Sequence, residues 1–173
     1  MDGSNNQRLA RPRLDAVDVR ILDLLQRDGR MSMRDLGAAV GLSSPAATER
    51  VRRLEARGVI RGYHAEVDPE RVGRPLVAFA TIALPYTGRP PGVFEKFVER
   101  IEAVVESYRI TGEDAYLVRI AVPTMDALGE TLDQLSELGR TRSFIALSTT
   151  KRNAVLLPPD APSYSRTPPS GAD

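Results

Sequence analysis

The sequence predicts an α+β protein with two small domains, a helical one followed by one in which strands and helices alternate. Its 173 residues are enough for one medium domain or two small ones. Apolar residues recur at helical spacing up to residue 58, whereas short apolar runs typical of strands begin at Leu76. Proline and glycine between these regions indicate a linker over residues 65–75. We therefore treat the two regions as separate domains.

Three helices are predicted before the linker, over residues 15–28, 32–40 and 44–57. Apolar side chains form one stripe on each of them, and residues that commonly cap or break helices stand at their ends. Pro45 fits the first turn of the third helix. The capping and breaking residues are Asp15, Gly29, Ser32, Gly41, Ser43 and Gly58.

The second and third helices are separated only by Gly41, Leu42 and Ser43, which predicts a helix-turn-helix. Residues 59–67 then alternate apolar and polar side chains around Gly62, a pattern that predicts a short two-stranded wing. The first domain is thus expected to be a winged helix-turn-helix over residues 14–64.

The second domain, residues 76–153, shows the order β-α-β-β-α-β. This order predicts a ferredoxin-like sheet of four antiparallel strands with both helices on one face. The first strand, LVAFATIAL, is too apolar for a solvated sheet face, so we expect at least a dimer through this domain. The fold hosts enzymes, sensors and RNA-binding proteins, and it does not define the function. The expected strands are 76–84, 104–111, 115–122 and 143–150, and the expected helices are 94–101 and 125–138.

Residues 1–13 and 158–173 are rich in Pro, Ser, Gly, Asn and Arg, and we place the two ends of the chain at residues 1–13 and 154–173. Such composition has too little apolar content to form a core, so both ends are predicted to be disordered tails. No apolar run approaches the roughly 20 residues of a membrane-spanning helix, and the first residues lack the apolar core of a signal peptide. We expect a cytoplasmic protein.

The composition argues against catalysis. The chain has no cysteine and one histidine, His64, which removes thiolate metal sites and most nucleophilic chemistry. Glu113 and Asp114 are adjacent acids on an expected turn, where a third ligand is lacking and a cation would be poorly held. No phosphate-binding glycine motif is present. We expect neither an enzyme nor a bound metal or cofactor.

Charge is unevenly distributed along the chain and indicates a polyanionic partner for its first part. Residues 1–64 hold 12 arginines against 8 acidic residues, whereas the remainder holds 12 basic against 15 acidic residues. Several of these arginines lie on the third helix, whose outer face would meet double-stranded DNA. Thr48, Glu49 and Arg52 are the candidates for base contacts. Ser43, Ser44, Arg50 and Arg53 are the candidates for phosphate contacts.

Two other interpretations of these features stay open at this point. The basic helix face could simply be solvated, or the protein could bind a metabolite and regulate an enzyme through protein contacts. RNA binding through the sheet is disfavoured, because the central strands lack paired aromatic residues.

Five short motifs from Leu14 to Gly73 resemble the DNA-binding half of the Lrp/AsnC family. They are Leu14-Asp15, Gly29-Arg30, Gly41-Leu42-Ser43, Arg-Val-Arg-Arg-Leu-Glu at 50–55 and Gly-Val-Ile-Arg-Gly-Tyr at 58–63. The region 76–153 resembles the ligand-sensing domain of the same family. The resemblance implies a homodimer, in some members assembled into octamers, that binds operator DNA and responds to an amino acid or a related metabolite.

The family's effector loop usually reads Gly-Asp-Tyr-Asp-Tyr, and this chain has Gly-Glu-Asp-Ala-Tyr at 112–116. The resemblance implies effector contacts from Gly112, Glu113, Asp114 and Tyr116. Thr141 and Ser143 match hydroxyl positions of the family's pocket. Ala115 replaces the second aspartate, which changes where a carboxylate could meet a ligand ammonium. The alternative for this loop is a plain polar hairpin turn.

Overall fold

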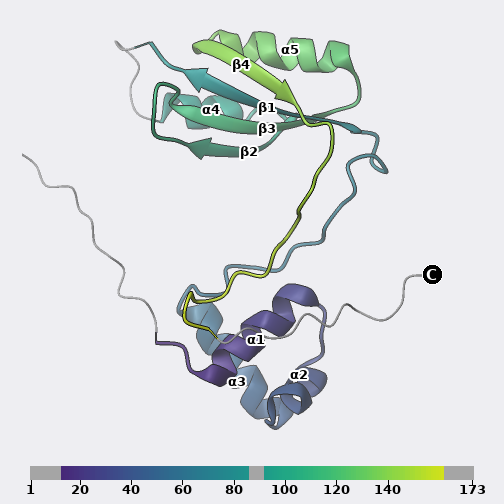
Figure 1. The fold of residues 1–173 in the computed structure, drawn as a ribbon, viewed down its shortest axis with the longest axis vertical. Helices are drawn as coiled ribbons and strands as arrows, with labels where there is room; N and C mark the ends of the chain where they lie inside the picture. Colours follow the sequence, from purple (N-terminus) through teal and green to yellow (C-terminus); the bar gives the residue numbers. More distant parts are fainter. Residues whose placement is uncertain (1–12, 86–91, 162–173) are drawn as a thin grey trace, which may run out of the picture. The chain divides into compact units, whose positions relative to one another are not determined.

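The computed structural model describes residues 13–85 and 92–161. The chain forms two compact units, with the boundaries after Ala65 and after Arg152 (Figure 1). Residues 153–161, which follow Arg152, belong to the same unit as the N-terminal helices. The predicted tails at residues 1–12 and 162–173 lie outside the described residues.

Three helices make up most of the first unit: α1 (Ala16–Arg27), α2 (Met33–Val40) and α3 (Ser44–Ala56). The predicted caps are confirmed. The side chains of Asp15, Ser32 and Ser43 each accept a hydrogen bond from a backbone N–H of the first turn that follows. Gly41 ends α2 with a φ of 72°, a conformation that glycine adopts without strain.

Apolar side chains from all three helices meet in one core. Ile21 of α1, Leu36 of α2 and Leu54 of α3 are completely buried, and Val51 is nearly so. The turn between α2 and α3 packs closely on α2, because a Cβ at Gly37 would lie 2.8 Å from the carbonyl oxygen of Leu42. This close approach fixes the angle at which the chain enters α3.

The expected wing is wrong for the described chain: residues 57–75 contain no strand. The backbone N–H groups of Val59 and Ile60 donate to the carbonyl oxygen of Leu54 at the end of α3, not to a neighbouring strand. Their side chains pack against the helical core. Tyr63 then donates a hydrogen bond from its hydroxyl to Glu55, and burial together with this carboxylate raises the pKa of Tyr63 to about 12. The apolar alternation therefore reflects packing on the helices.

The C-terminal segment also departs from expectation, because residues 153–161 are not a free tail. The side-chain amide of Gln26 on α1 donates to the backbone oxygen of Leu156 and accepts from its N–H, at 3.0 and 2.8 Å. Leu157 packs against the helical core. The apolar run Val155-Leu156-Leu157 was the available signal for this contact, and the proline-rich residues that follow it hid that signal.

The second unit contains the predicted β-α-β-β-α-β order (Figure 1). Its four strands pair antiparallel in the order β2-β3-β1-β4, and side chains of both helices share one core with the sheet, which confirms the ferredoxin-like arrangement. The elements are β1 (Leu76–Ala83), α4 (Val93–Val98), β2 (Val104–Arg109), β3 (Tyr116–Val122), α5 (Met125–Ser136) and β4 (Arg140–Ile145).

The last strand was expected over residues 143–150 but spans Arg140–Ile145. It pairs with β1 from Ala83 back to Ala78, and β1 begins only two residues before that, so residues beyond 146 have no strand to pair with. The sequence pattern located the strand only in part, at residues 143–145. Its ends depend on pairing with β1, which is distant in sequence.

The two faces of the sheet differ in what covers them. Ala78, Ala80 and Ile82 of β1 are buried beneath the helices. The alternate residues of β1 point to the opposite face, where neither α4 nor α5 packs. On that face Phe144 and Tyr108 are 58% and 50% exposed. We call this surface the open sheet face; its residues include Val77, Phe79, Thr81, Glu106, Tyr108, Leu117, Arg119, Arg142 and Phe144.

The close approach at Gly37 makes a testable prediction. Gly37→Ala should lower the free energy of unfolding by about 1–3 kcal/mol, because the added methyl group meets backbone atoms that cannot move aside. Gly129→Ala on α5 is the matched control, since its methyl group would meet no atom within 4 Å. That substitution should raise the free energy of unfolding by about 0.5–1 kcal/mol. Urea denaturation followed by circular dichroism measures both, and equal effects would contradict this account of the turn.

Candidate functional site

Helix α3 presents one exposed polar face formed by Glu49, Arg52 and Arg53. Its other sides are occupied by the core residues Val51 and Leu54. Within the described ranges, Arg52 has no hydrogen bond or ion pair to another residue. A guanidinium held on a rigid helix and free of protein partners can bind phosphate or a guanine edge.

The hydroxyl groups at the start of α3 are already used within the helix. Ser43 Oγ accepts from the N–H of Ala46, as an N-cap does, and Thr48 donates from Oγ1 to the carbonyl oxygen of Ser44 at 2.9 Å. Ser44 is partly buried, whereas Ser43 is exposed. Each hydroxyl keeps further hydrogen-bonding capacity, so these bonds orient the side chains without blocking them.

Arg50 lies apart from that face and reaches α1. Its Nη1 donates to Asp15 Oδ2 at 2.6 Å and to Asp18 Oδ1 at 2.7 Å. The pKa of Asp15 lies below its ordinary value, first because the backbone N–H of Asp18 donates to it and then because Arg50 does. The same two carboxylates raise the pKa of Arg50. Arg50 therefore joins α3 to the start of α1.

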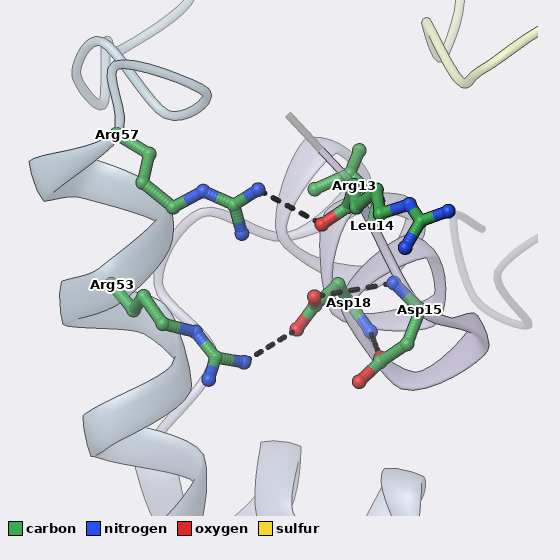
Figure 2. A pocket seen from close by; sticks show the side chains of 6 residues that line it. All are labelled: Arg13, Leu14, Asp15, Asp18, Arg53 and Arg57. Atoms are coloured by element: carbon green, nitrogen blue, oxygen red, sulfur yellow. Dashed lines mark hydrogen bonds and ion pairs between the residues drawn. The ribbon is translucent and has the colours of Figure 1, made fainter. Parts of the chain in front are cut away.

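Asp18 is the centre of this ionic network. It is 2% exposed and closes a capping box with Asp15, in which each side chain accepts from the other residue's backbone N–H. Arg53 Nη2 lies 3.5 Å from the same carboxylate, from a side chain that is half exposed (Figure 2). Sequence reasoning missed this role, although Asp18 stands in line with Ile21, Leu22 and Leu25 on the inward stripe of α1. An acid on an apolar stripe was the available signal.

The candidate effector loop turns at Gly112, whose φ of 118° favours glycine. Glu113 is exposed, whereas Asp114 is buried and accepts a hydrogen bond from Arg142 of β4 at 2.5 Å. This guanidinium is the chief reason that the pKa of Asp114 lies below its ordinary value. No sequence pattern pointed to Arg142, since the pairing spans 28 residues and crosses strand β1.

The other candidate effector residues lie on the helix-covered side of the sheet. Tyr116 is buried there, with its ring stacked on Phe94 of α4 at 3.8 Å and its hydroxyl donating to Glu95. Thr141 and Ser143 pair with Ile82 and Ala80, which point to that same side. Asp114 instead meets Arg142, which belongs to the open sheet face. Within one chain, Asp114 thus pairs on one side of the sheet, whereas Tyr116, Thr141 and Ser143 lie on the other.

Residues 13–85 and 92–161 hold no group of three or more His, Cys, Asp or Glu side chains that could bind a metal ion. None of the helices described within those ranges is both long and apolar enough to cross a membrane.

Known proteins match both units of the chain. Residues 14–55 match the AsnC-type helix-turn-helix domain, and residues 77–156 match the Lrp/AsnC ligand binding domain. The leucine-responsive regulatory protein of Escherichia coli K12 is 39% identical over 147 residues, which cover 81% of this chain and 88% of that protein.

Solved structures agree with these matches. The leucine response regulatory protein LrpA of Mycobacterium tuberculosis is 37% identical, with a TM-score of 0.72, and the match covers 84% of this chain and all of that one. A feast or famine regulatory protein of M. tuberculosis, solved in complex with L-methionine, is 36% identical with a TM-score of 0.78 over the same shares. With a DNA-binding helix-turn-helix and a ligand-binding domain both matched, this chain belongs to the Lrp/AsnC family of transcriptional regulators.

Proposed function

We propose that this regulator binds specific operator DNA through α3 and changes that binding when its second unit takes up an amino acid or a related small metabolite. The observation that carries the proposal is the exposed face of α3, which is formed by Glu49, Arg52 and Arg53. The helix that carries this face is fixed at both ends. A cytoplasmic location, as the sequence predicts, is part of this proposal.

The contacts of each side chain support different roles on DNA. Thr48, Glu49 and Arg52 lie in the first two and a half turns of α3, the part of a recognition helix that reaches base edges. Arg53, half exposed, and the serines Ser43 and Ser44 are suited to phosphate oxygens. Arg50 is bonded to the carboxylates of Asp15 and Asp18 at the start of α1. We therefore propose that Arg50 orients α3 and does not make the phosphate contact expected from sequence.

The effector proposal rests on the matched ligand-binding domain and on the relative solved with L-methionine. We propose contacts from Gly112, Glu113, Asp114, Tyr116, Thr141 and Ser143. Because Asp114 pairs on the side of the sheet opposite to Tyr116, Thr141 and Ser143, we propose that a second subunit completes the pocket. Calorimetric titration with the L-amino acids and their keto acids is the direct test, and an absence of heat with all of them would contradict amino-acid sensing.

We also propose a homodimer that covers the open sheet face, with higher assemblies such as an octamer built from it. This face places Phe79, Leu117 and Phe144 together, and apolar side chains on a sheet face are normally packed against another layer. Sedimentation velocity at micromolar concentration should give at least a dimer, and Phe144→Glu should shift the protein towards monomer. A parent protein that sediments as a monomer would contradict the proposal.

The DNA-binding proposal predicts distinct effects for two neighbouring arginines. A duplex selected from a random library supplies the specific site, and a scrambled duplex supplies the comparison. Arg53→Ala should weaken binding to both duplexes alike and reduce the salt slope by about one unit, since one phosphate contact is lost. Arg52→Ala should cost about 1–3 kcal/mol on the selected duplex and relax the preference at one base position.

Fluorescence anisotropy over a salt titration measures both effects. Lys96→Ala is the control, because it removes one exposed positive charge from α4 in the other unit. If both arginine variants bind the two duplexes as the parent does, α3 does not present this face to DNA.

A further inference from the structure

Residues 153–157 pack against the first unit and have no role in the function proposed so far. Val155 and Leu157 are partly buried, whereas the side chain of Leu156 between them is 82% exposed. Leu157 packs against the core of the three helices. This alternation is typical of an extended peptide with one face on the protein. We call the segment the return strap.

Gln26 of α1 holds the return strap by its backbone. The Nε2 of Gln26 donates to the carbonyl oxygen of Leu156 at 3.0 Å, and its Oε1 accepts from the N–H of the same residue at 2.8 Å. The same Nε2 donates to the carbonyl oxygen of Leu22, one helical turn back, which orients the side-chain amide. Gln26 thus pairs with Leu156 as a residue of a neighbouring strand would, and the pairing does not use the Leu156 side chain.

The return strap gives the first unit a second covalent connection to the other unit. Residues 66–152 form the other unit, and the chain comes back to the first unit at Asn153. Segments 66–75 and 146–152 therefore both join the two units (Figure 1). The second segment acts as a tether only while the return strap is docked, because its far end is then fixed to α1.

The second tether is short, and its near end is fixed. Residues 146–152 reach at most about 25 Å when fully extended. The N–H of Ala146 donates to the carbonyl oxygen of Val77 at 2.9 Å, which holds the start of the segment on the sheet. Arg152 Nη1 lies 3.8 Å from Glu66 Oε1, so the two joining segments lie together where both meet the first unit. A unit held by one flexible segment can turn about it, whereas a second short segment restricts that motion.

The contacts of the return strap do not involve the proposed DNA-binding face. Gln26 lies near the C-terminal end of α1, and the core cluster that Leu157 joins includes none of Glu49, Arg52 and Arg53. Two hydrogen bonds and one partly buried leucine also make a small contact, which can open while the helices stay folded. The return strap can therefore change how freely the unit moves without changing the side chains that meet DNA.

We propose that Gln26 and Leu157 are positioning residues for DNA binding. By docking the return strap they limit the motion of each DNA-binding unit, so that the dimer accepts only a narrow range of half-site spacings. The inference rests on the proposed DNA-binding function and on the proposed dimer, and it adds to them what determines the spacing. Units that turn freely would accept many spacings, although B-DNA presents a half-site on its opposite side after about 5 base pairs.

The test measures affinity against half-site spacing for the parent and for the double variant Gln26→Ala, Leu157→Ala. The half-site of the selected duplex is placed twice in duplexes whose spacing increases by single base pairs over one helical turn, and fluorescence anisotropy gives each Kd. The parent should lose about tenfold or more in affinity when its best spacing changes by about 5 base pairs, and the double variant about threefold or less. Affinity for a single half-site should be equal in both, because α3 is unchanged.

Two further variants separate the return strap from its neighbours. Leu156→Ala removes an exposed side chain and keeps both backbone bonds, so it should retain the parent's spacing preference. A Gly-Ser insertion of about six residues between Ser148 and Thr149 lengthens the second tether while the strap stays docked. The insertion should broaden the spacing preference as the double variant does, and it leaves the helical core intact if the double variant unfolds.

Hydrogen exchange of the Leu156 amide, followed by NMR, reports whether the strap is docked in solution, and it should be slower in the parent than in Gln26→Ala. Equal exchange in the two proteins would overturn the inference, as would an insertion variant with the parent's narrow preference. A parent that binds all spacings equally would also overturn it, while leaving DNA binding by α3 intact. A parent that sediments as a monomer or does not distinguish the selected from the scrambled duplex would instead contradict the proposed function itself.

Discussion

The ion pair between Asp18 and Arg50 is the interaction on which the DNA-binding unit depends. A carboxylate that is almost completely buried is costly unless charged and hydrogen-bonding partners surround it. Asp18 has the backbone N–H of Asp15 on one side and Arg50 on the other. The Asp18 carboxylate has its full set of partners only when α3 lies where the Arg50 guanidinium reaches α1. The pairing therefore selects one packing of α3 among those that the apolar core alone would permit.

This pairing also sorts the arginines of α3 into separate roles. Arg50, Arg53 and Arg57 follow one another at spacings of three and four, which puts them along one side of the helix, towards α1. Arg50 is fully engaged there, Arg53 is shared with solvent, and Arg57 holds the backbone of Arg13. Arg52 stands on the exposed face with Glu49. In the proposed function, this one helix carries the structural tie Arg50, the phosphate contact Arg53 and the base-reading Arg52, and their spacing along the helix separates the three roles.

Much of the fold could be predicted from local sequence, because helix caps and apolar periodicity are local properties. Asp15, Ser32, Ser43 and Gly41 determine the ends of the helices, and the βαββαβ order follows from the alternating patterns of the second half. The errors concern contacts between distant residues. The supposed wing packs on the end of α3, Leu156 pairs with Gln26 across 130 residues, and β4 ends where β1 offers no further partner.

The candidate sites show the same limit. The helical wheel identified the exposed face of α3 but could not show that Arg50 is bonded to two acids of α1. In the effector loop, Asp114 is paired with Arg142, which belongs to the side of the sheet opposite to Thr141 and Ser143. A resemblance to a family indicates which positions of this chain correspond to the family's site. The bonding partner of each side chain at those positions depends on the residues that this chain itself has there.

The role of Arg50 is the central claim, and Arg50→Gln tests it most directly when stability and DNA binding are measured on the same preparation. Arg50→Gln should lower the free energy of unfolding by about 1.5–3 kcal/mol, because the buried carboxylate of Asp18 loses its nearest charged donor and keeps only Arg53 at 3.5 Å. Asp18→Asn, which removes the charge as well, should partly restore the stability. Under conditions where the variant remains folded, the salt slope of DNA binding should equal that of the parent. A slope lower by about one unit with unchanged stability would contradict the account, since Arg50 would then be a phosphate contact and not the tie between α3 and α1.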